Sequence, residues 1–136
     1  MNPNDYQKQA LRTESTPMFI AYNAGSPPEE QEKNARVAAR LMHGAIGMAT
    51  EVGELQDAIK KLFIYGKELD GVNVMEECGD VLWYIALALD AVDCTMEQCM
   101  ARNIAKLQKR FPERFTEEQA LVRDLDAERA ALEGEK

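Results

Sequence analysis

Two pairs of acidic residues are the part of this sequence best suited to chemistry. Glu51 and Glu54 are three residues apart, and so are Glu77 and Asp80. Residues three apart share one face of a helix, so each pair would point two carboxylates in the same direction. A helical hairpin that turns around 65–66 would place Glu51 opposite Asp80. It would also place Glu54 opposite Glu77. The four carboxylates would then meet at one level between two antiparallel helices.

A cluster of this kind predicts a bound divalent cation. Two unit charges about 5 Å apart repel by roughly 3 kcal/mol at an effective dielectric near 20, so four carboxylates at one level need a counter-charge. Sites built only from oxygen ligands suit Mg²⁺ or Mn²⁺. We therefore expect a Mg²⁺ site, with Mn²⁺ as the other candidate ion, held by the following ligands: Glu51, Glu54, Glu77 and Asp80.

Other metal and phosphate sites do not fit the sequence. A di-iron carboxylate bundle needs Glu-x-x-His motifs on two helices, and the single histidine, His43, is not part of one. The sequence also lacks a twelve-residue EF-hand loop and a Gly-rich GxxxxGK(S/T) phosphate loop. No pairing of nucleophile and base can be assembled from one histidine and three scattered cysteines.

A second set of residues could bind phosphate. Asn103, Lys106 and Arg110 are spaced three and four apart, so they would line one face of a helix. Basic side chains near a carboxylate–metal cluster would suit a polyphosphate ligand, because the metal and the cations would neutralise its oxygens from two sides. The alternative interpretation is a solvated basic face or a partner for the acidic C-terminal segment. Lys61, after the first acid pair, is a weaker second source of positive charge.

The periodicity of apolar residues predicts helices along almost the whole chain, and no strand is needed. Gly66 and Asp70 mark a turn between two long helices. Thr95 with Gln98 forms a capping box that opens the next helix, and a similar signal at 116–119 opens the last. The expected elements are a short helix, a loop and four further helices, in this order: 5–13, 14–30, 31–63, 72–92, 95–112 and 116–132.

Small and apolar residues indicate where these elements pack. Gly44, Gly47 and Gly53 would let another helix or a ligand approach the backbone of the long helix closely. The apolar residues 18–20 lie in the expected loop, and their hydrophobicity predicts that they dock on the body of the protein or on a second subunit.

Composition sets the broad class of the protein. The 136 residues suit one domain, and 46% hydrophobic with 29% charged residues fits a soluble globular protein. The net charge of −8 argues against a nucleic-acid-binding surface. No apolar run approaches the roughly 20 residues that span a bilayer, so no membrane partner is expected. Three cysteines, odd in number and without metal or redox spacing, suggest reduced thiols, and without a signal peptide the predicted location is cytoplasmic.

Three ordered segments resemble one known family. These are 47–55 (GMATEVGEL), 76–84 (EECGDVLWY) and 103–112 (NIAKLQKRFP). They are similar to the motifs of the MazG-like nucleoside triphosphate pyrophosphohydrolases, and the resemblance covers roughly 5–115. It implies an all-α fold with a four-helix-bundle core and assembly as a homodimer or homotetramer, to which the helix expected from the capping signal adds an extra C-terminal helix. The corresponding segments would be an N-terminal helix and loop at 1–33, the core at 34–115 and a charged helix at 116–136.

The resemblance also implies an activity. The enzyme would use Mg²⁺ to hydrolyse a ribo- or deoxynucleoside triphosphate between the α and β phosphates, giving a monophosphate and pyrophosphate. Glu51 or Glu54 would accept the proton of the attacking water. The family often has a further Glu where this chain has Thr50. If that acid helps to hold a second metal ion or to orient the water, this chain would use fewer ions or another base. The alternative is a helical protein that binds nucleotide and metal as a sensor, or that serves in interactions, without turnover.

Overall fold

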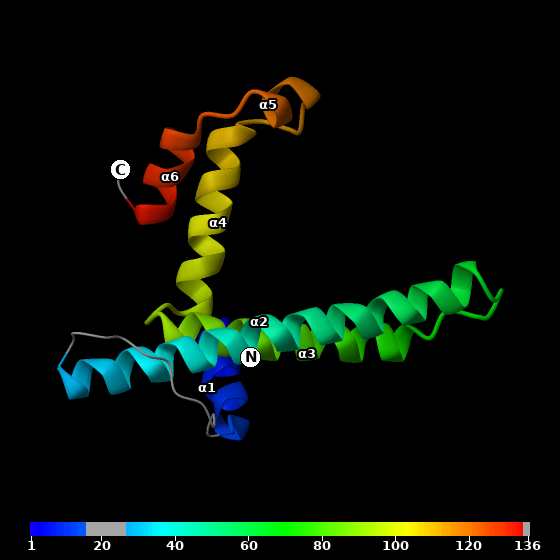
Figure 1. Ribbon diagram of the computed structural model, residues 1–136. Coiled ribbons are helices and arrows are strands. Elements are labelled where there is room, and N and C mark those ends of the chain that lie inside the picture. Colours follow the sequence, from blue (N-terminus) through cyan, green and yellow to red (C-terminus); the bar gives the residue numbers. More distant parts are fainter. Residues whose placement is uncertain (16–26, 135–136) are drawn as a thin grey trace. The chain divides into compact units, whose positions relative to one another are not determined.

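The computed structural model describes residues 1–15 and 27–134, and every regular element among them is helical, as expected. The chain divides into two compact units, Met1–Cys94 and Thr95–Lys136, which are described in turn. Within the described ranges, no helix combines the length and hydrophobicity needed to cross a membrane. The elements, labelled in Figure 1, are α1 (Pro3–Ala10), the 3-10 helix η1 (Leu11–Thr13), α2 (Pro28–Phe63), α3 (Gly71–Ala91), α4 (Met96–Arg110), α5 (Glu117–Leu121) and α6 (Leu125–Glu133).

The first unit is built on the long hairpin of α2 and α3, which lie side by side (Figure 1). The turn forms where the sequence predicts it. Gly66 has a positive φ of 60°, and the Lys67 N–H donates to the Lys61 carbonyl at 3.1 Å, which closes the end of α2. The Asp70 side chain then accepts the first backbone N–H groups of α3 and caps that helix.

Two glycines let α2 approach α3 closely. A Cβ atom on Gly47 would lie 2.1 Å from the Tyr84 ring, and one on Gly44 would lie 3.2 Å from the Ala88 Cβ. The close approach predicted at these two positions is therefore confirmed. Gly53 is different, because a Cβ there would meet nothing within 4 Å among the described residues. The helices consequently press together about one turn before the first acid pair.

The short helix α1 packs against α3 through polar contacts. The Tyr6 hydroxyl donates to the Gly79 carbonyl at 3.2 Å. The Trp83 indole N–H donates to the Ala10 carbonyl at 2.9 Å and to the Thr13 hydroxyl at 2.8 Å. These contacts attach α1 and η1 to the same stretch of α3 that carries the second acid pair.

A buried arginine joins the start of the chain to the hairpin. Arg40 of α2 is 9% exposed and binds Glu14 at 2.6 Å and Asp90 of α3 at 2.8 Å. Helix α2 begins at Pro28, three residues earlier than expected, because proline at the first helical position costs no hydrogen bond. The predicted docking of residues 18–20 lies outside the described residues.

The second unit consists of α4, α5 and α6, with α6 packed against α4. The capping box at the start of α4 is confirmed, since Thr95 and Gln98 each accept the other's backbone N–H. The single helix expected over 116–132 is wrong, because the chain leaves helical geometry at Val122. Asp124 then accepts the Ala127 N–H at 2.9 Å and starts a new helix, so the interruption has its own cap.

Candidate metal centre

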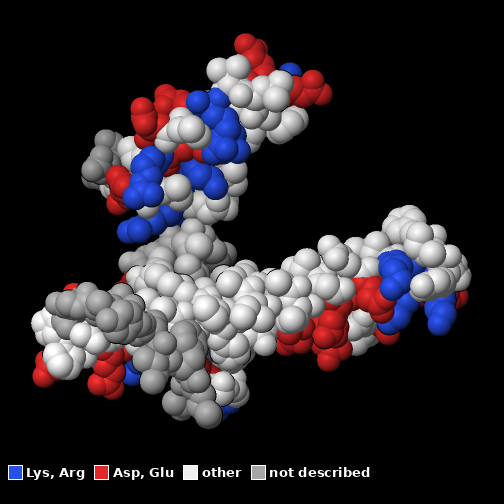
Figure 2. Space-filling view, viewed as in Figure 1, with Lys and Arg blue, Asp and Glu red and all other residues white. Residues whose placement is uncertain are grey.

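Three of the four predicted ligands converge between the hairpin helices. Glu51 comes from α2, and Glu77 and Asp80 come from α3. One carboxylate oxygen from each of the three lies within 4.8 Å of the others. Figure 2 shows acidic side chains gathered on this hairpin beside an uncharged surface. The structure therefore brings together acids that are at least 26 residues apart across the turn.

The fourth acid, Glu54, lies outside this group of three. It is exposed and follows Glu51 by about one turn of α2. Its charge still acts on the cluster, because it is one of the groups that raise the pKa of Glu51. In the converging group, Glu51 therefore meets both acids of α3, and the pairing of Glu54 with Glu77 stays a prediction.

The electrostatics of Glu51 reflect crowding of negative charge. Removal from water raises the pKa of Glu51, and the charges of Glu54, Asp80 and Glu77 raise it further. The Thr50 hydroxyl, 3.4 Å from a Glu51 oxygen, acts weakly in the opposite direction. The charged groups that shift the pKa of Glu51 are all carboxylates. The acids of the cluster therefore repel one another, and a bound cation would relieve that repulsion.

Two residues that the sequence did not single out as site residues lie at the cluster, one in contact with a carboxylate and one beside it. Asn73 donates its amide N–H to Glu77 at 2.6 Å. The Tyr6 hydroxyl donates to the carbonyl of Gly79, the residue before Asp80, and burial together with the Asp80 charge raises the pKa of Tyr6. The spacing of Asn73, one turn before Glu77 on a helix, was the available signal. The contact of Tyr6 had no signal in spacing, because it depends on how α1 folds back.

The donor set fits a hard divalent cation. All three converging donors are carboxylate oxygens, and neither His nor Cys is among them. Mg²⁺ and Mn²⁺ prefer such ligands, and their positive charge would offset the excess negative charge of the carboxylates. Glu51, Glu77 and Asp80 could therefore hold one such ion.

Lys61, expected to contact substrate, lies towards the end of α2. Its ammonium group is 3.0 Å from Asp57, and Lys60 shares the same carboxylate at 2.9 Å. These ion pairs lower the pKa of Asp57. The side chains of Asp57, Lys60 and Lys61 are about half exposed, so the ion pair of Lys61 with Asp57 lies in solvent on the helix surface.

The other three predicted substrate residues lie on α4 in the second unit. Asn103 is exposed and Lys106 is half-buried. Arg110 is paired with Glu128 of α6, through Nε at 2.8 Å and Nη2 at 2.5 Å. Arg110 is thus an ion-pair partner of the acidic C-terminal segment, which was the alternative interpretation of this residue.

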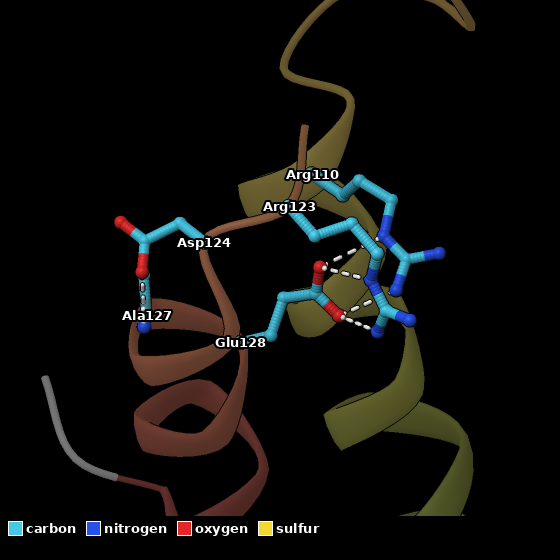
Figure 3. A network of polar contacts seen from close by, with 5 residues as sticks. All are labelled: Arg110, Arg123, Asp124, Ala127 and Glu128. Carbon is cyan, nitrogen blue, oxygen red and sulfur yellow. Dashed lines mark hydrogen bonds and ion pairs between the residues drawn. The ribbon is translucent and has the colours of Figure 1, made fainter. Parts of the chain in front are cut away.

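Glu128 holds two guanidinium groups at once, as Figure 3 shows. Arg123 also binds both of its oxygens, at 3.2 Å and 2.6 Å. Glu128 is 4% exposed, and its bonds to Arg110 and Arg123 lower its pKa to about 2. We call these three residues the arginine clamp. It ties α6 to the end of α4.

Comparison with known proteins places this architecture in a family. The model of the MazG nucleotide pyrophosphohydrolase domain matches residues 45–115, which is more than half of the chain. The chain belongs to this family. The match contains both acid pairs and the α4 residues Asn103, Lys106 and Arg110, and it leaves out α1, α5 and α6.

One curated relative is a phage protein. The Gene 37 protein of Mycobacterium phage L5 is 32% identical over 77 residues, which cover 52% of this chain and 65% of the relative. This chain thus spans slightly less than two thirds of that protein. No solved structure matches the fold.

Proposed function

We propose that this protein is a Mg²⁺-dependent nucleoside triphosphate pyrophosphohydrolase that serves nucleotide-pool housekeeping. It would cleave ribo- or deoxynucleoside triphosphates between the α and β phosphates, releasing a monophosphate and pyrophosphate. The observation that carries the proposal is the convergence of Glu51, Glu77 and Asp80 from two helices inside the MazG match. Membership of the family supports the reaction class, and the oxygen-only donor set supports the ion.

The acids of the hairpin would share the work of the site. A bound Mg²⁺ or Mn²⁺ would supply charge neutralisation for the phosphates and an acidified water. Glu51, Glu77 and Asp80 would hold it, with Glu54 as the fourth ligand or as the base. Glu51 is the other candidate base, and its raised pKa favours proton uptake.

Basic and amide side chains would bind the phosphates. We assign this role to Asn103, Lys106 and Arg110 of α4 and to Lys61 of α2. The pairing of Arg110 with Glu128 uses Nε and Nη2. A guanidinium carries five N–H donors, so this pairing leaves the Nη1 donors for a phosphate oxygen. Lys61 could exchange Asp57 for phosphate at little cost, because exposed ion pairs contribute about 0–1 kcal/mol.

The working form would be a homodimer or homotetramer in which hairpins from two copies complete a four-helix bundle. An isolated hairpin leaves large apolar side chains in water, and bundles bury such faces against partner helices. Exposed fractions on the hairpin support this assembly: Ile46 59%, Val52 41%, Ile59 44%, Met75 69% and Leu82 42%. The three reduced thiols, Cys78, Cys94 and Cys99, are compatible with the cytoplasm as the place of action.

Product analysis tests the reaction. The protein is incubated with a panel of ribo- and deoxynucleoside triphosphates, with Mg²⁺ and with EDTA, and the products are separated by ion-exchange chromatography. Monophosphate and pyrophosphate, formed only with metal, are expected. Diphosphate and phosphate would show that another bond is cleaved. Tight nucleotide binding without any product would favour the sensor alternative.

The Glu54→Gln variant separates the two roles open to that residue. If Glu54 is the base, turnover falls about 100-fold or more while Mn²⁺ binding stays, because general base catalysis typically contributes 10²–10⁴-fold. If it is a ligand, Mn²⁺ binding weakens together with turnover. Glu76→Gln, an exposed acid on α3 outside the converging group, is the matched control and should change neither.

A further inference from the structure

The least exposed acid of the cluster is bound by a neutral side chain. Glu77 is 4% exposed, and the Asn73 amide nitrogen lies 2.6 Å from its Oε1. Both residues are on α3, one helical turn apart. The contact therefore forms within one helix and does not depend on how α2 is placed.

The chemistry of this pair suits a metal ligand. An ionised carboxylate only accepts hydrogen bonds, so the amide must present its N–H to Glu77. Burying a carboxylate without a donor is costly, and the hydrogen bond from Asn73 reduces that cost. A lysine or arginine would do the same but would cancel the negative charge that a cation needs. An amide satisfies one oxygen and leaves the full charge, and a carboxylate still has its second oxygen to offer.

The position of Asn73 is itself fixed. Its backbone N–H donates to the Asp70 side chain at 3.1 Å, in the cap of α3. The cap anchors the first turn, and the first turn presents the amide to Glu77. This restraint matters because the charges of Glu51 and Asp80 would push a free Glu77 side chain away from the cluster.

We propose that Asn73 is a positioning residue that holds Glu77 in its ion-binding orientation before a divalent cation arrives. This inference rests on the proposed function, because it takes the cluster to be a divalent-metal site. Outer hydrogen bonds to metal ligands commonly change metal affinity by 10- to 100-fold. Loss of the amide donor should therefore weaken metal binding without removing any ligand.

The test measures binding of Mn²⁺ alone to the full chain, by isothermal calorimetry and by the loss of the free-ion paramagnetic resonance signal. Asn73→Leu keeps the branched shape of the side chain and removes the donor, and its dissociation constant for Mn²⁺ should rise about 10- to 100-fold at unchanged stoichiometry. Gln56→Leu, the same amide-to-leucine change at an exposed position of α2, should match the wild type. Asn73→Gln, which keeps an amide, should recover most of the lost affinity.

Further outcomes decide the inference. Should the leucine variant lose its helical circular dichroism, Asn73→Ala replaces it, because alanine is the best helix former. Wild-type affinity in the leucine or alanine variant would overturn the positioning role. Equal weakening in the glutamine variant would assign the effect to packing and overturn the donor role. Absence of Mn²⁺ binding in the wild type itself would instead remove the proposed metal centre, which distinguishes the two failures.

Discussion

At the scale of single residues, Gly47 shows how one missing side chain sets the spacing of the helices that carry the acids. The ring of Tyr84 occupies the space where a Cβ would be, and it packs edge-on against His43 at 5.6 Å and Trp83 at 4.9 Å between ring centroids. Because the ring is held on two sides, it cannot move without disturbing its neighbours. Gly47 thus keeps α2 close to α3 one turn before Glu51.

Gly47→Ala is expected to destabilise the protein by up to about 2 kcal/mol. Overpacking typically costs about 1–3 kcal/mol, and the better helix propensity of alanine returns about 1. The free energy of unfolding in urea measures the effect. Gly53→Ala is the matched control on the same helix, and with open space around its Cβ it should stabilise by about 0.5–1 kcal/mol. Destabilisation at Gly53 as large as at Gly47 would contradict the packing explanation.

Removing one charge from the cluster should stabilise the metal-free protein. The raised pKa of Glu51 means that its charged form is disfavoured in the fold, so the penalty is full above that pKa and disappears as pH falls below the ordinary value. Glu51→Gln should therefore gain about 0.5 kcal/mol at neutral pH without metal, the usual scale for like-charge pairs. Thermal unfolding with added Mn²⁺ should reverse the order, because only the wild type gains from binding. An unchanged order with Mn²⁺ would count against the metal site.

At the scale of elements, local signals predicted the helices, and contacts between helices decided the rest. Gly66 and Asp70 fix the hairpin turn, and Thr95 with Gln98 fixes the start of α4, because each acts within a few residues. Which acids converge depends on the rotation of α2 against α3, and no local pattern encodes it, so the spacing alone does not separate Glu54 from the three acids that the structure brings together.

The ion-pair partner of Arg110 could not be predicted from residue spacing within α4 either. The acidic segment was one candidate among several, and only the packing of α6 on α4 selects Glu128, 18 residues away. The sequence does not predict the break near Val122, because an aspartate such as Asp124 can lie on the exposed face of a continuous helix or cap the start of a new one.

The arginine clamp predicts how α6 responds to acid. Because the pKa of Glu128 is lowered to about 2, its contribution to stability is complete above its ordinary pKa of 4.5 and is lost as pH falls from there towards 2. Glu128→Gln should lower stability at pH 7, and its difference from the wild type should shrink over that range. Chemical denaturation at several pH values measures both.

A matched control uses the exposed pair of Arg129 and Glu133 on the same helix. Glu133→Gln should change stability by no more than about 0.5 kcal/mol, because exposed ion pairs contribute little. A Glu128 variant that behaves like the Glu133 variant would contradict the importance of the clamp.

At the scale of the whole molecule, the apolar surface of the hairpin predicts self-association. Ile46→Lys places a charge in that surface and should shift the mass measured by light scattering from a dimer or tetramer towards the monomer, because a buried unpaired charge is costly. Gln108→Lys, an exposed position on α4 outside the hairpin, is the control and should keep the wild-type mass. A wild-type protein that is already monomeric would contradict the assembly.

The contacts of Trp83 also give the protein an optical reporter. Trp83 is the single tryptophan of the chain, and its indole nitrogen is bonded to α1 and η1. It lies one helical turn from Asp80, so we expect its emission to respond both to the attachment of the N-terminal helix and to the charge at Asp80. Detachment of α1 would expose the indole to water and shift its emission to the red. One fluorescence titration with Mn²⁺ could therefore follow ion binding and N-terminal docking in unlabelled protein.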